Sequence, residues 1–83
     1  MIKQYMTRQR FEFEKYSAES GQWVKAGYLL MPDEVTEFHH YLNELEWSYD
    51  KAFERLTGKA ISDDFNNRVY RDIVLVVETI QAI

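Results

Sequence analysis

The spacing Glu37-x-x-His40, with Glu44 one helical turn later, is the pattern in this sequence closest to a metal site. On a helix the three side chains share one side, and carboxylate-bridged di-iron bundles use Glu-x-x-His pairs as ligands. Such bundles need two of these motifs and two further inward-facing carboxylates. This chain has one motif, and it points away from the apolar stripe of its segment. We therefore expect an exposed face without metal or cofactor.

Covalent catalysis has few candidate residues in this chain. There is no cysteine, neither histidine has a placed partner, and the three glycines form no phosphate-binding loop. The serines fall in expected turns, caps or helix surfaces. We expect a protein that is not an enzyme.

Composition indicates one small folded domain, residues 1–83, with 46% hydrophobic and 16% aromatic residues. The net charge of −4 divides unevenly, at +2 for residues 1–30 and −6 for residues 31–83. The first sixteen residues lack the apolar region of a signal peptide, and the longest apolar run, residues 73–77, is too short to span a bilayer. With no cysteine, these features favour a reducing, cytoplasmic location.

Residues 9–30 are expected to form a β-hairpin. Phe11 and Phe13 alternate with charged residues, residues 23–30 are rich in β-formers, and residues 17–22 have turn composition. A hairpin folded symmetrically about residues 19 and 20 places Phe11 opposite Tyr28, Phe13 opposite residue 26, and residue 14 opposite residue 25. One face is then apolar and the other charged, with a Glu14–Lys25 ion pair. An imperfect helix over residues 2–16 is the alternative.

Residues 33–57 are expected to form one long helix with Asp33 as its N-cap and Gly58 just beyond its end. Pro32 and two early acids suit its first turn. Apolar residues recur in steps of three and four, which places them on one side of the helix. They are Val35, Phe38, Leu42, Leu45, Tyr49, Ala52 and Leu56.

Residues 63–81 are expected to form a second helix, because Ser62, Asp63 and Asp64 resemble a capped helix start and the apolar residues fit a 3.6 period. The alternative is a strand through residues 73–77, which their β-branched content favours. A short loop makes the two helices antiparallel. The expected fold class is α+β, an N-terminal β-hairpin packed on an antiparallel two-helix hairpin (ββαα).

Trp47 is the residue that does not fit the apolar stripe. On a continuous helix it lies on the opposite side, so it packs under the hairpin or serves as an exposed anchor for a partner. The candidate partner-binding residues are Trp47, His40, Asn43, Lys51, Tyr41 and Glu44. We expect a small acidic protein–protein interaction module, an inhibitor or adaptor of the kind that mobile elements carry. Its wide apolar helix surfaces favour a homodimer, and nothing in the sequence indicates a membrane partner.

The N-terminal segment supplies an alternative function. Basic and aromatic residues alternate there, and on a β-ribbon they could stack on bases and follow a phosphate backbone. Acidic neighbours weaken the positive field of this segment. The candidate nucleic-acid-binding residues are Arg8, Arg10, Lys15, Lys25 and Trp23.

Overall fold

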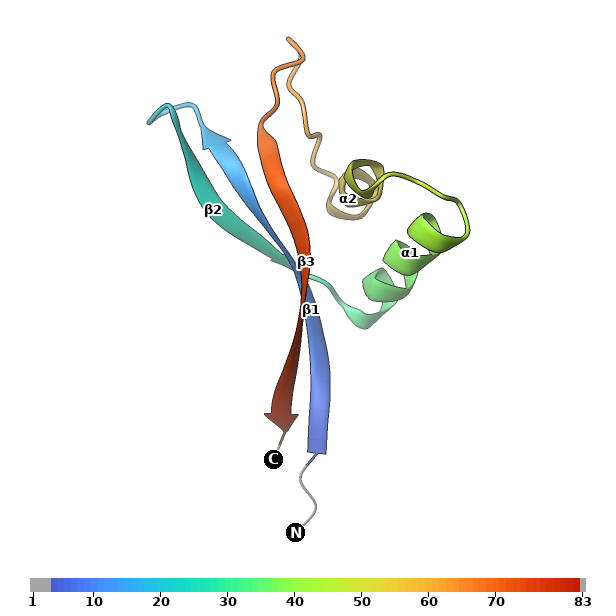
Figure 1. The fold of residues 1–83 in the computed structure, drawn as a ribbon. Helices are drawn as coiled ribbons and strands as arrows, with labels where there is room; N and C mark the ends of the chain where they lie inside the picture. The colour runs from blue at the N-terminus through green and yellow to red at the C-terminus, as the bar shows by residue number, and fades with distance from the viewer. Residues whose placement is uncertain (1–3, 83) are drawn as a thin grey trace.

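A computed structural model describes residues 4–82 and shows the element order ββααβ (Figure 1). The elements are β1 (Gln4–Ser17), β2 (Gln22–Leu29), α1 (Pro32–Asn43), α2 (Tyr49–Thr57) and β3 (Tyr70–Ala82). The strands form one antiparallel sheet in the order β2-β1-β3. The expected ββαα arrangement is therefore wrong, because the C-terminal segment enters the sheet as its third strand.

The N-terminal hairpin is confirmed in its register. Phe11 lies opposite Tyr28, and Phe13 lies opposite Ala26. Glu14 lies opposite Lys25 as predicted, but its ion pair is with Arg71 of β3, at 3.4 Å, and not with Lys25. The β1 strand also begins earlier than the sequence indicates, since residues 4–9 pair with β3.

The expected 25-residue helix is wrong because residues 44–48 interrupt it. Ser48 caps α2, its hydroxyl accepting from the Lys51 N–H at 3.2 Å, and Glu46 in the break has a φ of 55°. The break lets α2 fold back beside α1, so both apolar segments reach one face of the sheet. Gly58 ends α2 with a φ of 69°, as the sequence predicts.

The start of α1 also differs from the prediction. Met31 occupies the N-cap position, and Asp33 lies within the first turn. The Glu34 carboxylate accepts hydrogen bonds from the Met31 N–H at 3.0 Å and from the Tyr28 hydroxyl at 2.7 Å. These two bonds tie the end of β2 to the beginning of α1, which fixes the direction of the helix against the sheet.

The expected helix over residues 63–81 is wrong, and the strand alternative is correct over Tyr70–Ala82. Asp63 does not begin a helix but closes a turn, accepting from the N–H groups of Phe65 at 2.9 Å and Asn67 at 2.8 Å. A bulge interrupts β3 opposite residues 12–14, where Asp72 has a φ of 55°. Above and below this bulge the strand pairs with β1 over nearly its whole length.

The core lies between the sheet and the two helices. Phe11 is at its centre, with ring centroids 5.1 Å from Phe38 and 5.3 Å from Phe53, in edge-to-face geometry. The helices cover only this face of the sheet and only part of its length, so the molecule is long and thin, with extents of 56 × 33 × 16 Å (Figure 1). The buried residues are Phe11, Phe13, Leu30, Phe38, Ala52, Phe53, Ile61 and Tyr70.

Candidate functional site

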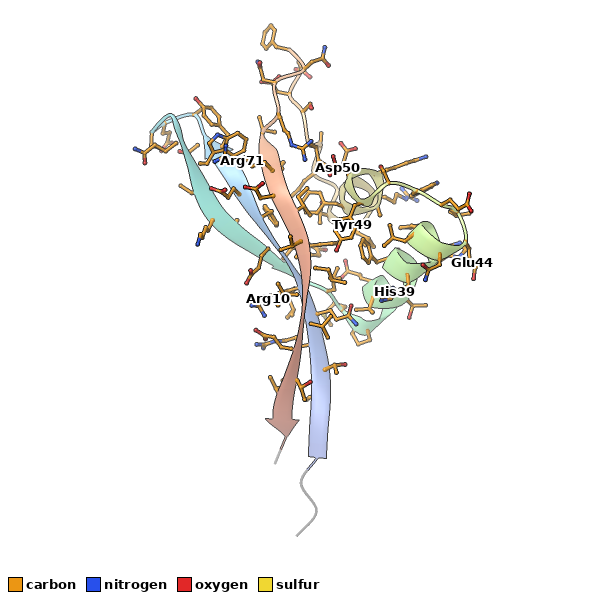
Figure 2. All side chains as sticks on the ribbon, viewed as in Figure 1. Arg10, His39, Glu44, Tyr49, Asp50 and Arg71 are labelled. Atoms are coloured by element: carbon orange, nitrogen blue, oxygen red, sulfur yellow. The ribbon has the colours of Figure 1, made fainter. Side chains whose placement is uncertain are left out.

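The face of the sheet away from the helices carries the charged half of the strand alternation. Directly opposed residues of an antiparallel pair place their side chains on the same face, so the register assigns this face. We call it the open face; Figure 2 shows Arg10 and Arg71 on this side and Tyr49 on the helix side. Its residues are Arg8, Arg10, Glu12, Glu14, Tyr16, Trp23, Lys25, Gly27, Leu29, Arg71, Val74, Val76 and Glu78.

Ion pairs across β1 and β3 organise the middle of the open face. Arg10 pairs with both Glu12, at 2.7 Å, and Glu78. Arg8 pairs with the same Glu78 carboxylate at 3.0 Å. The hydrogen bonds donated by Arg10 and then Arg8 lower the pKa of Glu78, and the bonds that Arg10 donates to Glu12 and Glu78 raise the pKa of Arg10. The two arginines and two glutamates in this part of the face therefore balance, and its net charge is close to zero.

An aromatic group closes the open face at the hairpin end. The Trp23 ring lies edge-on to Tyr16 at 5.5 Å, and the Arg71 guanidinium lies over Trp23 at 4.1 Å. The same guanidinium is 3.4 Å from Glu14. The guanidinium therefore already occupies a face of the Trp23 ring that a stacking base would use.

Between these two groups lies a hollow of about 500 Å³, which we call the Gly27 hollow. Gly27, in the middle of β2, contributes no side chain opposite Glu12, so the backbone forms part of the floor. Val74 on its wall is 50% exposed. The residues lining it are Arg10, Glu12, Phe13, Glu14, Lys25, Ala26, Gly27, Asp72 and Val74. The lining of the Gly27 hollow thus combines apolar surface with both acidic and basic side chains.

The structure brings together only some of the predicted partner-binding residues. Trp47 stacks on Tyr41 with ring centroids 4.5 Å apart, and the Lys51 ammonium lies 4.3 Å from the Trp47 centroid. Because the two groups cannot share one side of the ring, they cover opposite faces of Trp47. Beside this stack His40 pairs with Glu44 at 3.1 Å, and Asn43 is exposed at the end of α1.

The open face holds four of the five predicted nucleic-acid residues, Arg8, Arg10, Lys25 and Trp23, whereas Lys15 projects from the helix side of β1. Arg8 and Lys15 are seven positions apart on one strand, or about 23 Å. In the part of the chain that the structure describes, no group of three His, Asp or Glu side chains could hold a metal ion.

The sequence did not lead us to the Gly27 hollow, although two signals for it were present. A glycine inside a strand often marks a place where another group approaches the backbone closely, and Gly27 is such a residue. A strand with apolar residues at every position, as in residues 73–77, shows apolar side chains on both faces.

Neither helix within residues 4–82 is long and apolar enough to cross a membrane. The chain matches no family model, and comparison with curated proteins and with solved structures finds no match either.

Proposed function

We propose that this protein is a non-enzymatic interaction module, an inhibitor or adaptor of the cytoplasm, which binds another protein through the open face of its sheet. The observation that carries the proposal is the Gly27 hollow, an exposed concavity with a half-exposed Val74 on its wall. Binding hot spots concentrate where an anchor side chain fills such a pocket and charged groups form the rim. An apolar side chain of the partner fits against Val74.

The charges around the hollow support a protein partner over a nucleic acid. Glu12 and Glu14 stand beside Arg10 and Lys25, so the rim offers donors and acceptors for both signs of side chain. A phosphate backbone requires a run of unpaired positive charge, and here the arginines already hold carboxylates. Trp47, enclosed by its own chain on both ring faces, supports the helical hairpin in this proposal.

Filling the hollow tests the proposal. The backbone of Gly27 suits any residue, since its φ is not positive, and a Cβ there meets its nearest neighbour, the Phe11 carbonyl oxygen, at 3.4 Å. Gly27→Leu therefore occupies the hollow at small cost to the fold. Wild-type and variant chains are immobilised and exposed to extract of the native host, with and without nuclease treatment, and retained proteins are quantified by mass spectrometry.

We expect a protein that is retained by the wild type and by the control Thr36→Ala, on the exposed side of α1, but at least tenfold less by Gly27→Leu. Circular dichroism must show that both variants are folded. Equal retention by Gly27→Leu and wild type contradicts the proposal. Retention that disappears on nuclease treatment alone points instead to a nucleic-acid partner.

A further inference from the structure

The sheet continues beyond β2 as a two-stranded ribbon, which we define as residues 4–9 of β1 with residues 77–82 of β3. The β1–β2 pairing ends at Arg10 and Leu29, and Figure 1 shows the ribbon extending past both helices. Val77, on the helix side of the ribbon, is 58% exposed. A ribbon of two strands is marginally stable in water, so a further strand would add substantially to its stability.

The direction of the backbone groups shows which edge is free. The Gln9 carbonyl accepts from the Leu30 N–H at 2.9 Å, so Gln9, and by alternation Thr7, direct their backbone groups away from β3. Their register partners on β3, Val77 and Thr79, then direct theirs away from β1. In the order β2-β1-β3 this side of β3 is the outer edge of the sheet.

The occupant that this edge fits best is a second copy of the chain. The ribbon contains two charged residues, Arg8 and Glu78, and they pair with each other at 3.0 Å. The ribbon is thus neutral in a chain of net charge −4, which suits an equally neutral strand better than a charged partner. Residues 77–82 also contain no proline or lysine, the residues that commonly keep free edges apart.

We propose that the protein forms a homodimer in which the outer edges of the two β3 strands pair antiparallel, with Thr79 on the two-fold axis. Two observations favour this register over one shifted toward the bulge. A pairing centred on Val77 would extend to Leu75, beside which the Tyr49 side chain of α2 already lies (Figure 2). A pairing centred on Glu78 also extends to Leu75 and places the two Glu78 carboxylates opposite each other.

Centred on Thr79, the two strands pair Thr79 with Thr79 of the partner subunit and Val77 with Gln81 of the partner subunit. The result is one six-stranded sheet in the order β2-β1-β3-β3-β1-β2. This interface is separate from the Gly27 hollow, so the proposal does not rest on the proposed function, and Gly27→Leu is expected to remain dimeric.

Cysteine cross-linking tests the register directly, because the chain has no cysteine of its own. Hydrogen-bonded residues opposite each other in antiparallel strands have Cα atoms about 5.5 Å apart, within disulfide range. Thr79→Cys is therefore expected to form a covalent dimer under mild oxidation. The control is Thr7→Cys, which lies opposite Thr79 on the other edge and is expected to remain largely uncoupled. Equal coupling of both variants overturns the proposal.

Proline substitutions test the edge without cross-linking. Thr79→Pro and Thr7→Pro each remove an N–H that the β1–β3 ladder does not use, at the same register position. In sedimentation velocity we expect wild type and Thr7→Pro to have twice the chain mass of 10.0 kDa, as dimers. Thr79→Pro is expected to have the mass of a single chain. A monomeric wild type, or a folded Thr79→Pro that remains dimeric, overturns the proposal. If circular dichroism shows that Thr79→Pro is unfolded, Thr79→Lys takes its place, because it brings two ammonium groups together at the two-fold axis. Thr7→Lys is then the control.

Discussion

The side chain of Tyr49, at the start of α2, lies beside the backbone of Leu75 in the middle of β3 (Figure 2). Leu75 directs its N–H to the outer edge of the sheet, so a side chain from a helix occupies a position that a further strand would otherwise use. Covering an edge in this way limits unwanted strand addition. Burial raises the pKa of the Tyr49 phenol, and the Leu75 backbone opposes that rise. The contact thus joins the helical layer to the free edge of the sheet.

Removing this hydroxyl should expose the Leu75 amide. Tyr49→Phe keeps the ring, whose centroid lies 5.1 Å from that of Phe38, but loses the hydroxyl beside the Leu75 backbone. We expect the free energy of unfolding to fall by about 1 kcal/mol and hydrogen exchange at Leu75 to accelerate. Tyr28→Phe, which loses a bond to Glu34 instead, should leave Leu75 exchange unchanged. Unchanged exchange in Tyr49→Phe would show that the hydroxyl does not protect the edge.

Trp47 should prove to be a structural residue. Its ring is enclosed between Tyr41 and Lys51, and its N–H group on the backbone donates to the Tyr41 carbonyl at 2.9 Å. Trp47→Ala is expected to lower the free energy of unfolding by about 2 kcal/mol, because a half-buried stacked ring is lost. For a domain of this size the corresponding fall in Tm is about 10 °C.

The matched control for this prediction is Leu45→Ala in the same interhelical loop. Leu45 is 45% exposed, and its truncation should change stability by less than about 0.5 kcal/mol. The measurement is differential scanning calorimetry. If Trp47→Ala and wild type have equal thermal stability, Trp47 is not structural, and an exposed binding anchor is the better interpretation.

The hairpin was predictable because its information is local. Phe11, Phe13 and the turn lie within 22 consecutive residues, and the symmetric register places the two phenylalanines opposite apolar partners and Glu14 opposite Lys25. Gly58 was predictable for the same reason, since a left-handed residue after a helix needs nothing from the rest of the chain.

The third strand was not predictable from its own residues. An apolar set that covers half of a helix also fits a strand with apolar side chains on both faces, and residues 73–77 satisfy both patterns. The choice is made by β1, where Glu12 and Phe11 pair with Val74 and Leu75, more than 60 positions away. The Gly27 hollow depends on the same distant pairing, because Val74 forms one of its walls.

The break between the helices was hidden by the regularity of the apolar stripe. The three-four spacing continues through Leu45 and Tyr49, although the backbone does not. Ser48 followed by Asp50 is a helix start of ordinary composition, and it lies inside the stripe rather than at its end. Trp47 lies in this break, so its predicted place on the far side of a continuous helix is wrong, and its ring contacts Tyr41 of α1 and Lys51 of α2.

Acid should weaken the sheet and the turn before β3. Hydrogen bonds from Arg10 and Arg8 lower the pKa of Glu78, and the N–H groups of Asn67 and Phe65 lower that of Asp63. A carboxylate with a lowered folded pKa stabilises the protein above its unfolded pKa, and this stabilisation is lost as pH falls through the folded value.

We therefore expect the urea midpoint to decline between about pH 5 and pH 2. The decline should be shallower in the double variant Glu78→Gln and Asp63→Asn, which starts from a lower midpoint at neutral pH. Parallel curves for the double variant and the wild type would mean that neither carboxylate contributes to acid sensitivity.

Two left-handed positions should respond in opposite directions to substitution. Gly58 has a φ of 69° and nothing within 4 Å of where a Cβ would stand, so Gly58→Ala adds backbone strain without a clash. We expect it to lower the free energy of unfolding by about 1 kcal/mol.

Asp72, in the β3 bulge, has a φ of 55°, and its side chain is 71% exposed. Asp72→Gly relieves the strain of that backbone and should raise the free energy of unfolding by about 0.5 kcal/mol, despite the greater freedom of the unfolded chain. Urea unfolding of both variants measures the two effects, and a destabilised Asp72→Gly would show that the Asp72 carboxylate, 3.8 Å from Arg71, matters more than the backbone.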